Sequence, residues 1–324
     1  MNESNFVSSH STSRFELPRL ILASVLLLPA VAFPQTPAYK DSAADARAAW
    51  KTQTSLFGVK NGLFVIVGKG GNSVLRLTGN GLILVDGNYP TDYEALETRA
   101  QKTAFGELPI RALILTDYHE AHSGNNAQFL GDKTQIFAHE NVAGHLEKLK
   151  AGGKPIPSPT VTYTKDHIIR LGGVEVDLKH FGPARTNGDT IVFFPGHAVV
   201  ALGDLYSDKP DPDYAAGGSL LNWPTVLDEV LKLDFDTAVP GRGRAVSRAE
   251  VQALDEKLSR MIISARADVV AGSTRMQIGE KLRSGAFGID LDLSPAQLEG
   301  FYAELKEAAV GYRKDQGTLP REPR

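Results

Sequence analysis

The sequence contains no cysteine, and this absence limits the chemistry available to the chain. It excludes disulfides, thiolate metal ligands, a cysteine nucleophile and the acylated N-terminal cysteine of a lipoprotein. A metal site in this protein would therefore have to be built from His, Asp or Glu side chains.

A strong excess of charge is also missing. Lys and Arg number 35 and Asp and Glu number 38, which leaves a formal net charge of −3. Such a weak field does not indicate a nucleic acid or an anionic membrane surface as a partner, so we expect a small-molecule or protein partner. The 42% of hydrophobic and 23% of charged residues are typical of a folded chain with one large domain, or one domain plus an appendage. No pattern indicates an oligomeric state.

Residues 1–32 have the features of a cleavable secretory signal. Arg14 and Arg19 precede an apolar stretch, Leu20–Ala32, which ends in the small-residue pattern Ala-Val-Ala. This stretch is shorter than the roughly 20 residues that a membrane-spanning helix needs. We therefore predict cleavage near Ala32, no stable membrane span afterwards, and a periplasmic or secreted bacterial protein. A buried N-terminal helix is the alternative interpretation.

Residues 33–57 show no strand pattern and are interpreted as a linker, after which short β runs alternate with turns and helices. Runs rich in Val, Ile and Leu predict strands at 63–67, 73–77, 82–85, 112–116, 134–138, 168–171, 174–180, 190–194 and 198–202. Helices are predicted at 91–103, directly after 124, at 142–150 and at 219–233. This repeated order implies one domain, residues 58–247, with two sheets and helices outside them.

The segment 248–324 is predicted to be a helical extension. Capping boxes at Ser247 and Ser294 open two helices in it, and a similar box at Thr91 opens the helix at 91–103. Apolar side chains recur at helical spacing and predict a stripe that packs on the core: Leu298, Phe301, Tyr302, Leu305 and Ala309.

Four motifs follow one another in the order and spacing of a known family. They are TDYHEAHSGNN at 116–126, GPARTNGD at 182–189, LGDL at 202–205 and PGRG at 240–243. Together they resemble the metallo-β-lactamase superfamily over roughly residues 58–249, and four motifs in series are a specific signal. The resemblance implies an α+β fold, a four-layer αββα sandwich. It also implies a metal site at one edge where the sheets meet, which usually holds two zinc ions and an activated water.

The first motif departs from the family pattern His-x-His-x-Asp-His. Its four ligand positions here are Asp117, His119, Ala121 and His122. One histidine has therefore become a carboxylate, and the metal-binding aspartate has lost its side chain.

The later motifs depart as well. Arginine replaces a ligand histidine at Arg185 and at Arg242, while Asp204 keeps the bridging position. A guanidinium has five donors, no lone pair for a metal and a permanent charge. By the resemblance, one metal position keeps His119 and Asp117 and the other keeps His122 and Asp204. Neither reaches the about three protein ligands of a catalytic zinc site.

We therefore expect that the dinuclear chemistry is lost and that no metal is bound. In this interpretation Arg185 and Arg242 form ion pairs with Asp117 and Asp204 in the volume where the ions would lie. The chain would then be a pseudoenzyme, or would bind a small anionic ligand through its arginines and histidines.

An active enzyme is the alternative hypothesis. One zinc ion between His119, His122 and Asp204, with Asp117 as a fourth ligand, would suffice for a mononuclear metallohydrolase of an ester, lactone or related bond. A metal-free mechanism, with Ser123 activated by a histidine, is a further alternative.

The segment after Asp204 should overhang the site, because it follows a predicted strand that ends there. We predict an aromatic cleft rim with the acidic pair Asp211 and Asp213 beside it; its rings are Tyr118, Tyr206, Tyr214 and Trp223. Packing of these rings under a surface loop is the other interpretation. The remaining histidines fall on no ligand position of the family and are interpreted as structural: His139, His145, His167, His180 and His197.

Overall fold

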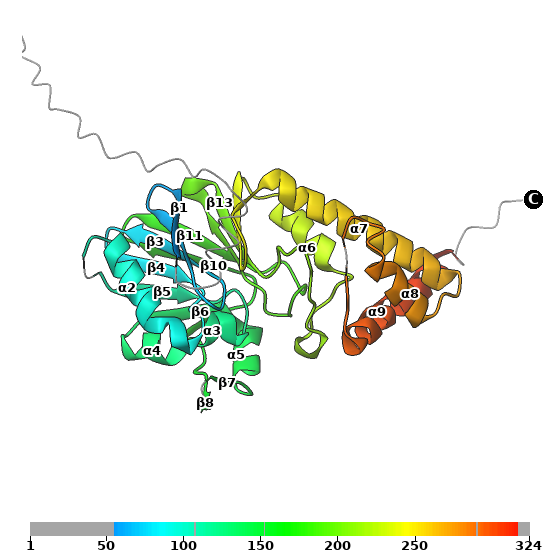
Figure 1. Cartoon of the computed structure of the whole chain (residues 1–324), viewed down its shortest axis with the longest axis horizontal. Coiled ribbons are helices and arrows are strands. Elements are labelled where there is room, and N and C mark those ends of the chain that lie inside the picture. The colour runs from blue at the N-terminus through cyan, green and yellow to red at the C-terminus, as the bar shows by residue number, and fades with distance from the viewer. Residues whose placement is uncertain (1–54, 107, 152, 290, 317–324) are drawn as a thin grey trace, which may run out of the picture. The chain divides into compact units, whose positions relative to one another are not determined.

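The computed structural model describes residues 55–316 except 107, 152 and 290 (Figure 1). The predicted signal peptide, residues 1–32, lies outside the described residues, as does the predicted linker up to residue 54. The first strand begins at Ser55, inside the stretch interpreted as linker. Within the described part of the chain, no helix is both long and apolar enough to span a bilayer.

The first sheet has seven strands in the order β1-β2-β3-β4-β5-β6-β9. β1 to β4 are antiparallel neighbours joined by short turns, whereas β4, β5, β6 and β9 run parallel. Parallel neighbours need crossover connections, and helices supply them here. The strands are β1 Ser55–Lys60, β2 Leu63–Val67, β3 Asn72–Thr78, β4 Gly81–Val85, β5 Ile110–Ile114, β6 Gln135–His139 and β9 Val161–Tyr163. The helices are α2 Tyr93–Thr103, α3 Glu120–Ser123, α4 Asn126–Gly131 and α5 Glu140–Leu146.

The second sheet has six strands in the order β10 to β15. Only β13 and β14 are parallel, and α6 Trp223–Val230 lies in the crossover between them. The strands are β10 Asp166–Leu171, β11 Val174–Lys179, β12 Ile191–Phe194, β13 Val199–Gly203, β14 Thr237–Pro240 and β15 Val246–Ser247. A small hairpin, β7 Lys150–Ala151 with β8 Lys154–Pro155, lies between α5 and β9 along the chain. The 3-10 turns are η1 Pro90–Asp92, η2 Pro195–His197 and η3 Tyr214–Ala216.

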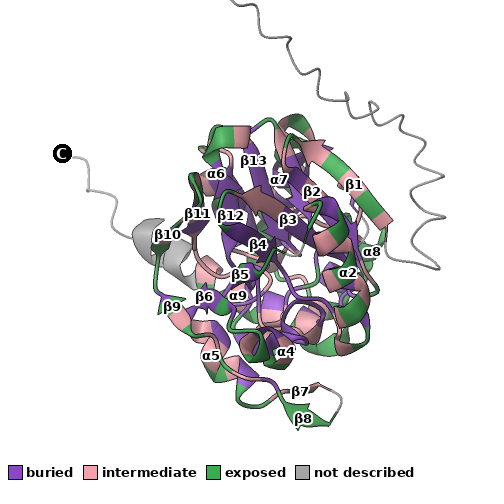
Figure 2. Ribbon diagram, turned by 90° about the vertical axis from the view of Figure 1, so that its left-hand side faces the viewer, coloured by how far each residue is buried: buried purple, intermediate pink, exposed green. Residues whose placement is uncertain are grey.

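Alternating side chains place the two sheets face to face with helices outside. In β2, Val65 faces a core shared with Val176 of the second sheet, while Ile66 faces a separate core with α2, α4 and α5. In β13, Val200 faces a third core with α6 and the C-terminal helices. Because neighbouring strand residues point to opposite faces, three cores mean four layers. The inner strands β4, β12 and β13 are accordingly buried along their whole length (Figure 2). The predicted αββα sandwich is confirmed.

The C-terminal extension packs on the second sheet. Its helices are α7 Arg248–Val270, α8 Arg275–Arg283 and α9 Pro295–Gln316. Leu258, Phe301 and Leu305 are fully buried in the core shared with α6. The predicted capping boxes at Ser247 and Ser294 are both formed.

Several predictions about elements were inaccurate, and the strands β9, β14 and β15 were not predicted. The capping box expected at Thr91 is absent, because α2 begins at Tyr93 and its N-cap, Asp92, accepts a hydrogen bond from the backbone of Lys69 instead (2.7 Å). α6 is shorter than the predicted helix at 219–233. α8 was missed, although Thr274 and Gln277 form a capping box at its start.

We expect the extension to unfold together with the sandwich. Truncation of the fully buried Phe301 to Ala should lower the free energy of unfolding by about 3–5 kcal/mol, because it leaves a cavity in a core shared with α6. Phe105→Ala is the matched control, since Phe105 is 97% exposed, and should change it by less than about 0.5 kcal/mol. Urea unfolding followed by circular dichroism measures both values. Two separate unfolding transitions in the wild type would contradict the expectation that the extension and the sandwich unfold together.

Candidate metal centre

Three of the four motifs lie at the carboxyl ends of parallel strands, while the second motif, 182–189, follows the antiparallel strand β11. Asp86 directly follows β4, Asp117 follows β5, and Asp204 follows β13. Backbone hydrogen bonds join these ends: the Gly241 N–H after β14 donates to the Gly203 carbonyl (2.6 Å), and the Asn72 N–H of β3 donates to the Gly241 carbonyl (2.7 Å). Polar side chains at the carboxyl ends of parallel strands commonly form ligand sites.

His122, on α3, is held rigidly from one side. Its Nδ1 lies 2.8 Å from Oδ2 of Asp86, and both side chains are almost fully buried. The carboxylate of Asp86 also accepts hydrogen bonds from the Thr116 backbone N–H and hydroxyl, each at 2.8 Å. This fixes the orientation of the imidazole.

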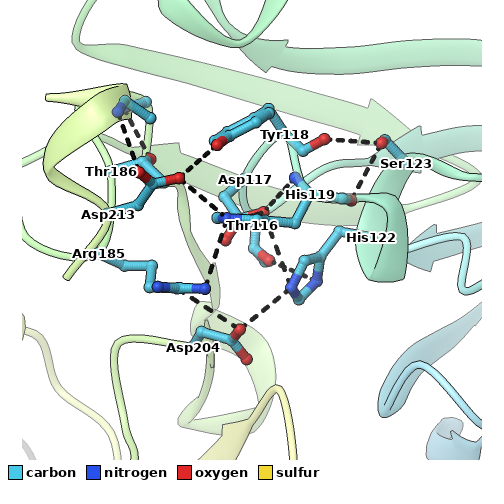
Figure 3. Close-up of polar contacts among 12 residues, drawn as sticks. Thr116, Asp117, Tyr118, His119, His122, Ser123, Arg185, Thr186, Asp204 and Asp213 are labelled. Carbon is cyan, nitrogen blue, oxygen red and sulfur yellow. Dashed lines mark hydrogen bonds and ion pairs between the residues drawn. The ribbon is translucent and has the colours of Figure 1, made fainter. Parts of the chain in front are cut away.

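The other ring nitrogen of His122 is buried and has no hydrogen-bond partner. This Nε2 lies 3.6 Å from Oδ2 of Asp204 and 3.8 Å from Oδ1 of Asp117 (Figure 3). Ligand atoms of the three side chains all lie within 4.8 Å of one another. Ligands of a tetrahedral zinc ion, at bond lengths of about 2.1 Å, lie roughly 3.4 Å apart. Asp117, His122 and Asp204 therefore have the donor types and spacing to hold one divalent ion.

Charge interactions keep these acids ionised. Burial alone would raise the pKa of Asp117, but the charges of His122 and His119 lower it to about 2. Burial likewise opposes ionisation of Asp204, yet its interactions with His122 and Arg242 hold its pKa well below the usual range. Burial would lower the pKa of His122, but Asp117 and Asp86 raise it well above its ordinary value. A proton on Nε2 of His122 and a metal ion would thus compete for the same position between the two carboxylates.

His119 does not belong to this three-residue cluster. Its Nδ1 lies 3.0 Å from Oδ1 of Asp117, and its Nε2 lies 3.3 Å from Oδ2 of Asp213. The His119 backbone N–H also donates to Asp117 (2.7 Å). The family has a histidine at position 117. The carboxylate found here instead binds the side chain and the backbone of His119. The ring lies beside that of Tyr118, whose hydroxyl donates to Asp213.

The two arginines behave differently. Nη1 of Arg242 lies 3.0 Å from both carboxylate oxygens of Asp204, as the sequence interpretation expected of one arginine. Nε of Arg185 lies 3.9 Å from Asp204, while its Nη1 lies 2.8 Å from the carboxylate of Asp211. Figure 3 shows Arg185 and His122 approaching Asp204 from different sides. The expected pairing of an arginine with Asp117 is not formed, because the two histidines occupy that carboxylate.

The predicted aromatic rim is brought together only in part. Tyr118 and Tyr214 lie by the site, where Tyr214 lines a cavity next to His119 and its hydroxyl donates to Glu304 (2.7 Å). Tyr206 packs partly buried against the core of the second sheet. Trp223 does not line the cleft, since it is fully buried in that core and its Nε1 donates to the Leu205 carbonyl (3.0 Å).

Other candidates have structural contacts. The hydroxyl of Ser123 is buried against the carbonyls of Tyr118 and His119, at 2.8 and 3.0 Å, so it is not presented to a substrate. Ala121 is buried on α3 and contributes no ligand. Four of the remaining histidines have a ring nitrogen within hydrogen-bond distance of an oxygen: His139, His145, His180 and His197.

Two residues that matter to the centre were not singled out as site residues by the sequence. Asp86 directly follows the strand predicted at 82–85, but only the structure shows that it is buried and has a φ of 63°, which marks a constrained position. Gln297 lies in the extension, and its Nε2 donates to Asp211 (2.5 Å). No pattern in the sequence links residues so far apart along the chain.

A curated protein and several solved structures are similar to this chain. The 2,4-dinitroanisole O-demethylase subunit alpha of Nocardioides sp. (strain JS1661) is 28% identical over 174 residues, which are 53% of this chain and 52% of that protein. The chain thus spans about half the length of this curated relative.

Solved structures share the fold. A metallo-beta-lactamase from Pontibacter korlensis superposes with a TM-score of 0.56 at 16% identity, covering 64% of this chain and 99% of its own. The DIM-1 metallo-beta-lactamase has a TM-score of 0.53 at 15% identity, covering 63% of this chain and 98% of its own. The model of the metallo-beta-lactamase superfamily matches residues 67–242, more than half of the sequence. This chain therefore belongs to the metallo-beta-lactamase superfamily.

Proposed function

We propose that this protein is an enzyme of the hydrolase type that binds one divalent metal ion through Asp117, His122 and Asp204. The observation that carries the proposal is the buried, unpartnered Nε2 of His122, which faces two ionised carboxylates. A buried polar atom without a partner costs about 1–3 kcal/mol, and coordination of an ion would remove this cost.

The surroundings of His122 support this assignment. A metal-ligating histidine usually donates its other ring N–H to a carboxylate, which fixes its orientation, and Asp86 is placed for that contact. Two carboxylates and a neutral imidazole also balance the charge of a dication. The donor set of one imidazole and two carboxylates suits Zn²⁺, Mn²⁺ or Fe²⁺.

Among the residues that the structure describes, no second group of donors comparable to this one is found. The other ligand positions of the family hold Ala121, Arg185 and Arg242, none of which offers a lone pair. His119 is turned toward Asp117 and Asp213. Our proposal is thus a single-metal centre and differs from the dinuclear one of the family.

The reaction would combine the ion with groups of this chain. When bound, the ion would supply a Lewis acid that polarises a substrate oxygen and acidifies water. Burial would lower the pKa of His119, but its hydrogen bond and charge interaction with Asp117 raise it, so this imidazole can hold a proton beside the centre. Arg242 neutralises part of the charge on Asp204 and limits how strongly that carboxylate repels an incoming nucleophile.

The relative suggests a class of bond. Its name describes O-demethylation of 2,4-dinitroanisole, an aryl methyl ether. Hydrolysis of such an ether consumes water and yields a phenol and methanol. We extend this class to the present chain as activated ethers and esters of acidic phenols.

A metal-free binding protein is the second candidate function. The contact of Arg242 with both oxygens of Asp204 favours it, because this pair compensates the carboxylate without an ion. Metal binding distinguishes the two candidates directly.

We expect one equivalent of Co²⁺ or Zn²⁺ to bind to protein freed of metal with EDTA. Three variants each remove a proposed ligand and should weaken metal binding by about 10-fold to 100-fold or more: Asp117→Asn, His122→Gln and Asp204→Asn. Asp86→Asn removes the contact that orients His122 and should weaken binding about 10-fold to 100-fold. His197→Gln is the matched control and should weaken it less than about threefold, because His197 lies outside the cluster and contacts the Asn61 carbonyl instead. Isothermal titration calorimetry gives these values. Failure of the wild type to bind metal would favour the metal-free candidate.

Activity should follow the same residues. With Zn²⁺, Mn²⁺ or Fe²⁺ added, we expect turnover of 4-nitrophenyl acetate or 2,4-dinitroanisole. His122→Gln should reduce kcat/KM about 100-fold or more, since it removes a ligand rather than a supporting contact. Release of the nitrophenol, measured by absorbance, is the assay. Turnover that is unchanged in this variant, or insensitive to EDTA, would contradict the proposal.

The metal-free centre should lose stability as the pH rises. Because the pKa of His122 is raised in the folded protein, its stabilising charge is fully present below about pH 6.5 and is lost as the pH rises through the folded-state value. The Tm gap between EDTA-treated wild type and His122→Gln should therefore be larger at about pH 6 than at about pH 9. In saturating Zn²⁺ the trend should reverse, since protons compete with the ion. If the Tm difference between the metal-free wild type and His122→Gln does not change with pH, the stabilising charge assigned to His122 is contradicted.

A further inference from the structure

A cavity of about 310 Å³ lies beside the metal centre, at His119 and Arg185. The segment after β13 supplies its second wall through Asp211, Asp213 and Tyr214. The third wall is the first turn of α9, with Gln297. This volume lies at the small end of the range for ligand pockets.

Arg185 presents one weakly engaged hydrogen-bond donor, Nη2, at this cavity. Its Nη1 is occupied by the carboxylate of Asp211, at 2.8 Å. Its Nε is buried and faces Asp204, at 3.9 Å, so it is not presented to the cavity. Its Nη2 lies 3.4 Å from a ring nitrogen of His119. A guanidinium normally directs such donors at oxygen atoms, and a ligand oxygen would satisfy Nη2.

The charges around the cavity disfavour an anion. Arg185 and His119 face Asp211 and Asp213, so the sum is zero even when His119 is counted as a cation. The rest of the lining includes the ring of Tyr214 and the apolar side chains of Pro212 and Ala296. An uncharged molecule with a flat apolar body and polar oxygens matches this surface better than a small carboxylate or phosphate does.

The C-terminal extension holds this arrangement in place. Nε2 of Gln297 donates to Oδ1 of Asp211 at 2.5 Å and to the Pro212 carbonyl at 3.1 Å, and Asp211 in turn fixes Arg185. The hydroxyl of Tyr214 donates to Glu304 of α9 (2.7 Å). The family match ends at residue 242, so α9 is a wall that the family model does not include.

We propose that this cavity is the substrate pocket, and that it takes an uncharged aromatic molecule whose nitro or ester oxygens accept hydrogen bonds from Arg185, with α9 as its outer wall. The inference rests on the proposed function, because it takes the metal centre as the place of reaction. It assigns to Arg185 a role in recognising substrate and to Gln297 a role in positioning Arg185.

Three probes of similar size test the chemistry of the pocket. Nitrobenzene and benzoate carry the same pair of oxygens and differ in charge, while toluene has neither. We expect the full chain, treated with EDTA, to bind nitrobenzene most tightly in ligand-observed NMR titrations. Arg185→Gln should weaken this binding about 10-fold, and Arg185→Lys by less, because the charge is kept. Arg170→Gln, a surface arginine paired with Glu175, is the control for lost charge.

Gln297→Ala should weaken nitrobenzene binding about threefold to 10-fold, because Asp211 and Arg185 lose their support. Gln252→Ala on α7 is its control, since Gln252 makes a comparable exposed contact with Glu256. Circular dichroism identifies any variant that fails to fold. If Arg185→Gln does not fold, Arg185→Lys replaces it.

Tightest binding of benzoate would overturn the assignment of an uncharged ligand. Equal binding in wild type and Arg185→Gln would overturn the role of Arg185. Both results are obtained without metal, so they leave the metal titration to decide the proposed function separately.

Discussion

The contact between Asp86 and His122 is the constraint on which the centre depends. It fixes one ring nitrogen of a fully buried imidazole at 2.8 Å from a carboxylate and turns the other nitrogen toward Asp117 and Asp204. Thr116 locks Asp86 in turn, through its backbone and its hydroxyl. A buried imidazole held in this way is either a cation among three carboxylates or a metal ligand, and both states use the same geometry.

The substituted positions form a consistent electrostatic system around this imidazole. Arg242 binds both oxygens of Asp204, and Arg185 bridges the region between Asp204 and Asp211. His119 is removed from the ligand set because the carboxylate of Asp117 attracts both its ring and its backbone N–H. The replacements therefore reduce the space and donors for a second ion, yet leave the donors for one in place.

The sequence predicted the sandwich well, because alternating apolar runs and turn residues are local signals that tertiary packing does not override here. It also located all four motifs. The contacts between motifs were harder to predict: which arginine meets which carboxylate depends on loop geometry, and Asp117 interacts with histidines instead. Trp223 was misplaced at the rim because a buried and an exposed aromatic residue look alike in a loop-to-helix segment. Asp86 and Gln297 reach the site from distant parts of the chain, and no pattern in the sequence connects them with it.

X-ray absorption spectroscopy of the zinc-loaded protein tests the central claim most directly, because it counts histidine ligands and detects neighbouring metal ions. The account predicts a shell of nitrogen and oxygen atoms at about 2.0–2.1 Å with the scattering of a single imidazole and no second metal nearby. A spectrum with two or more imidazoles, or with a metal–metal distance of about 3.5–4 Å, would contradict the three-residue centre proposed for Asp117, His122 and Asp204.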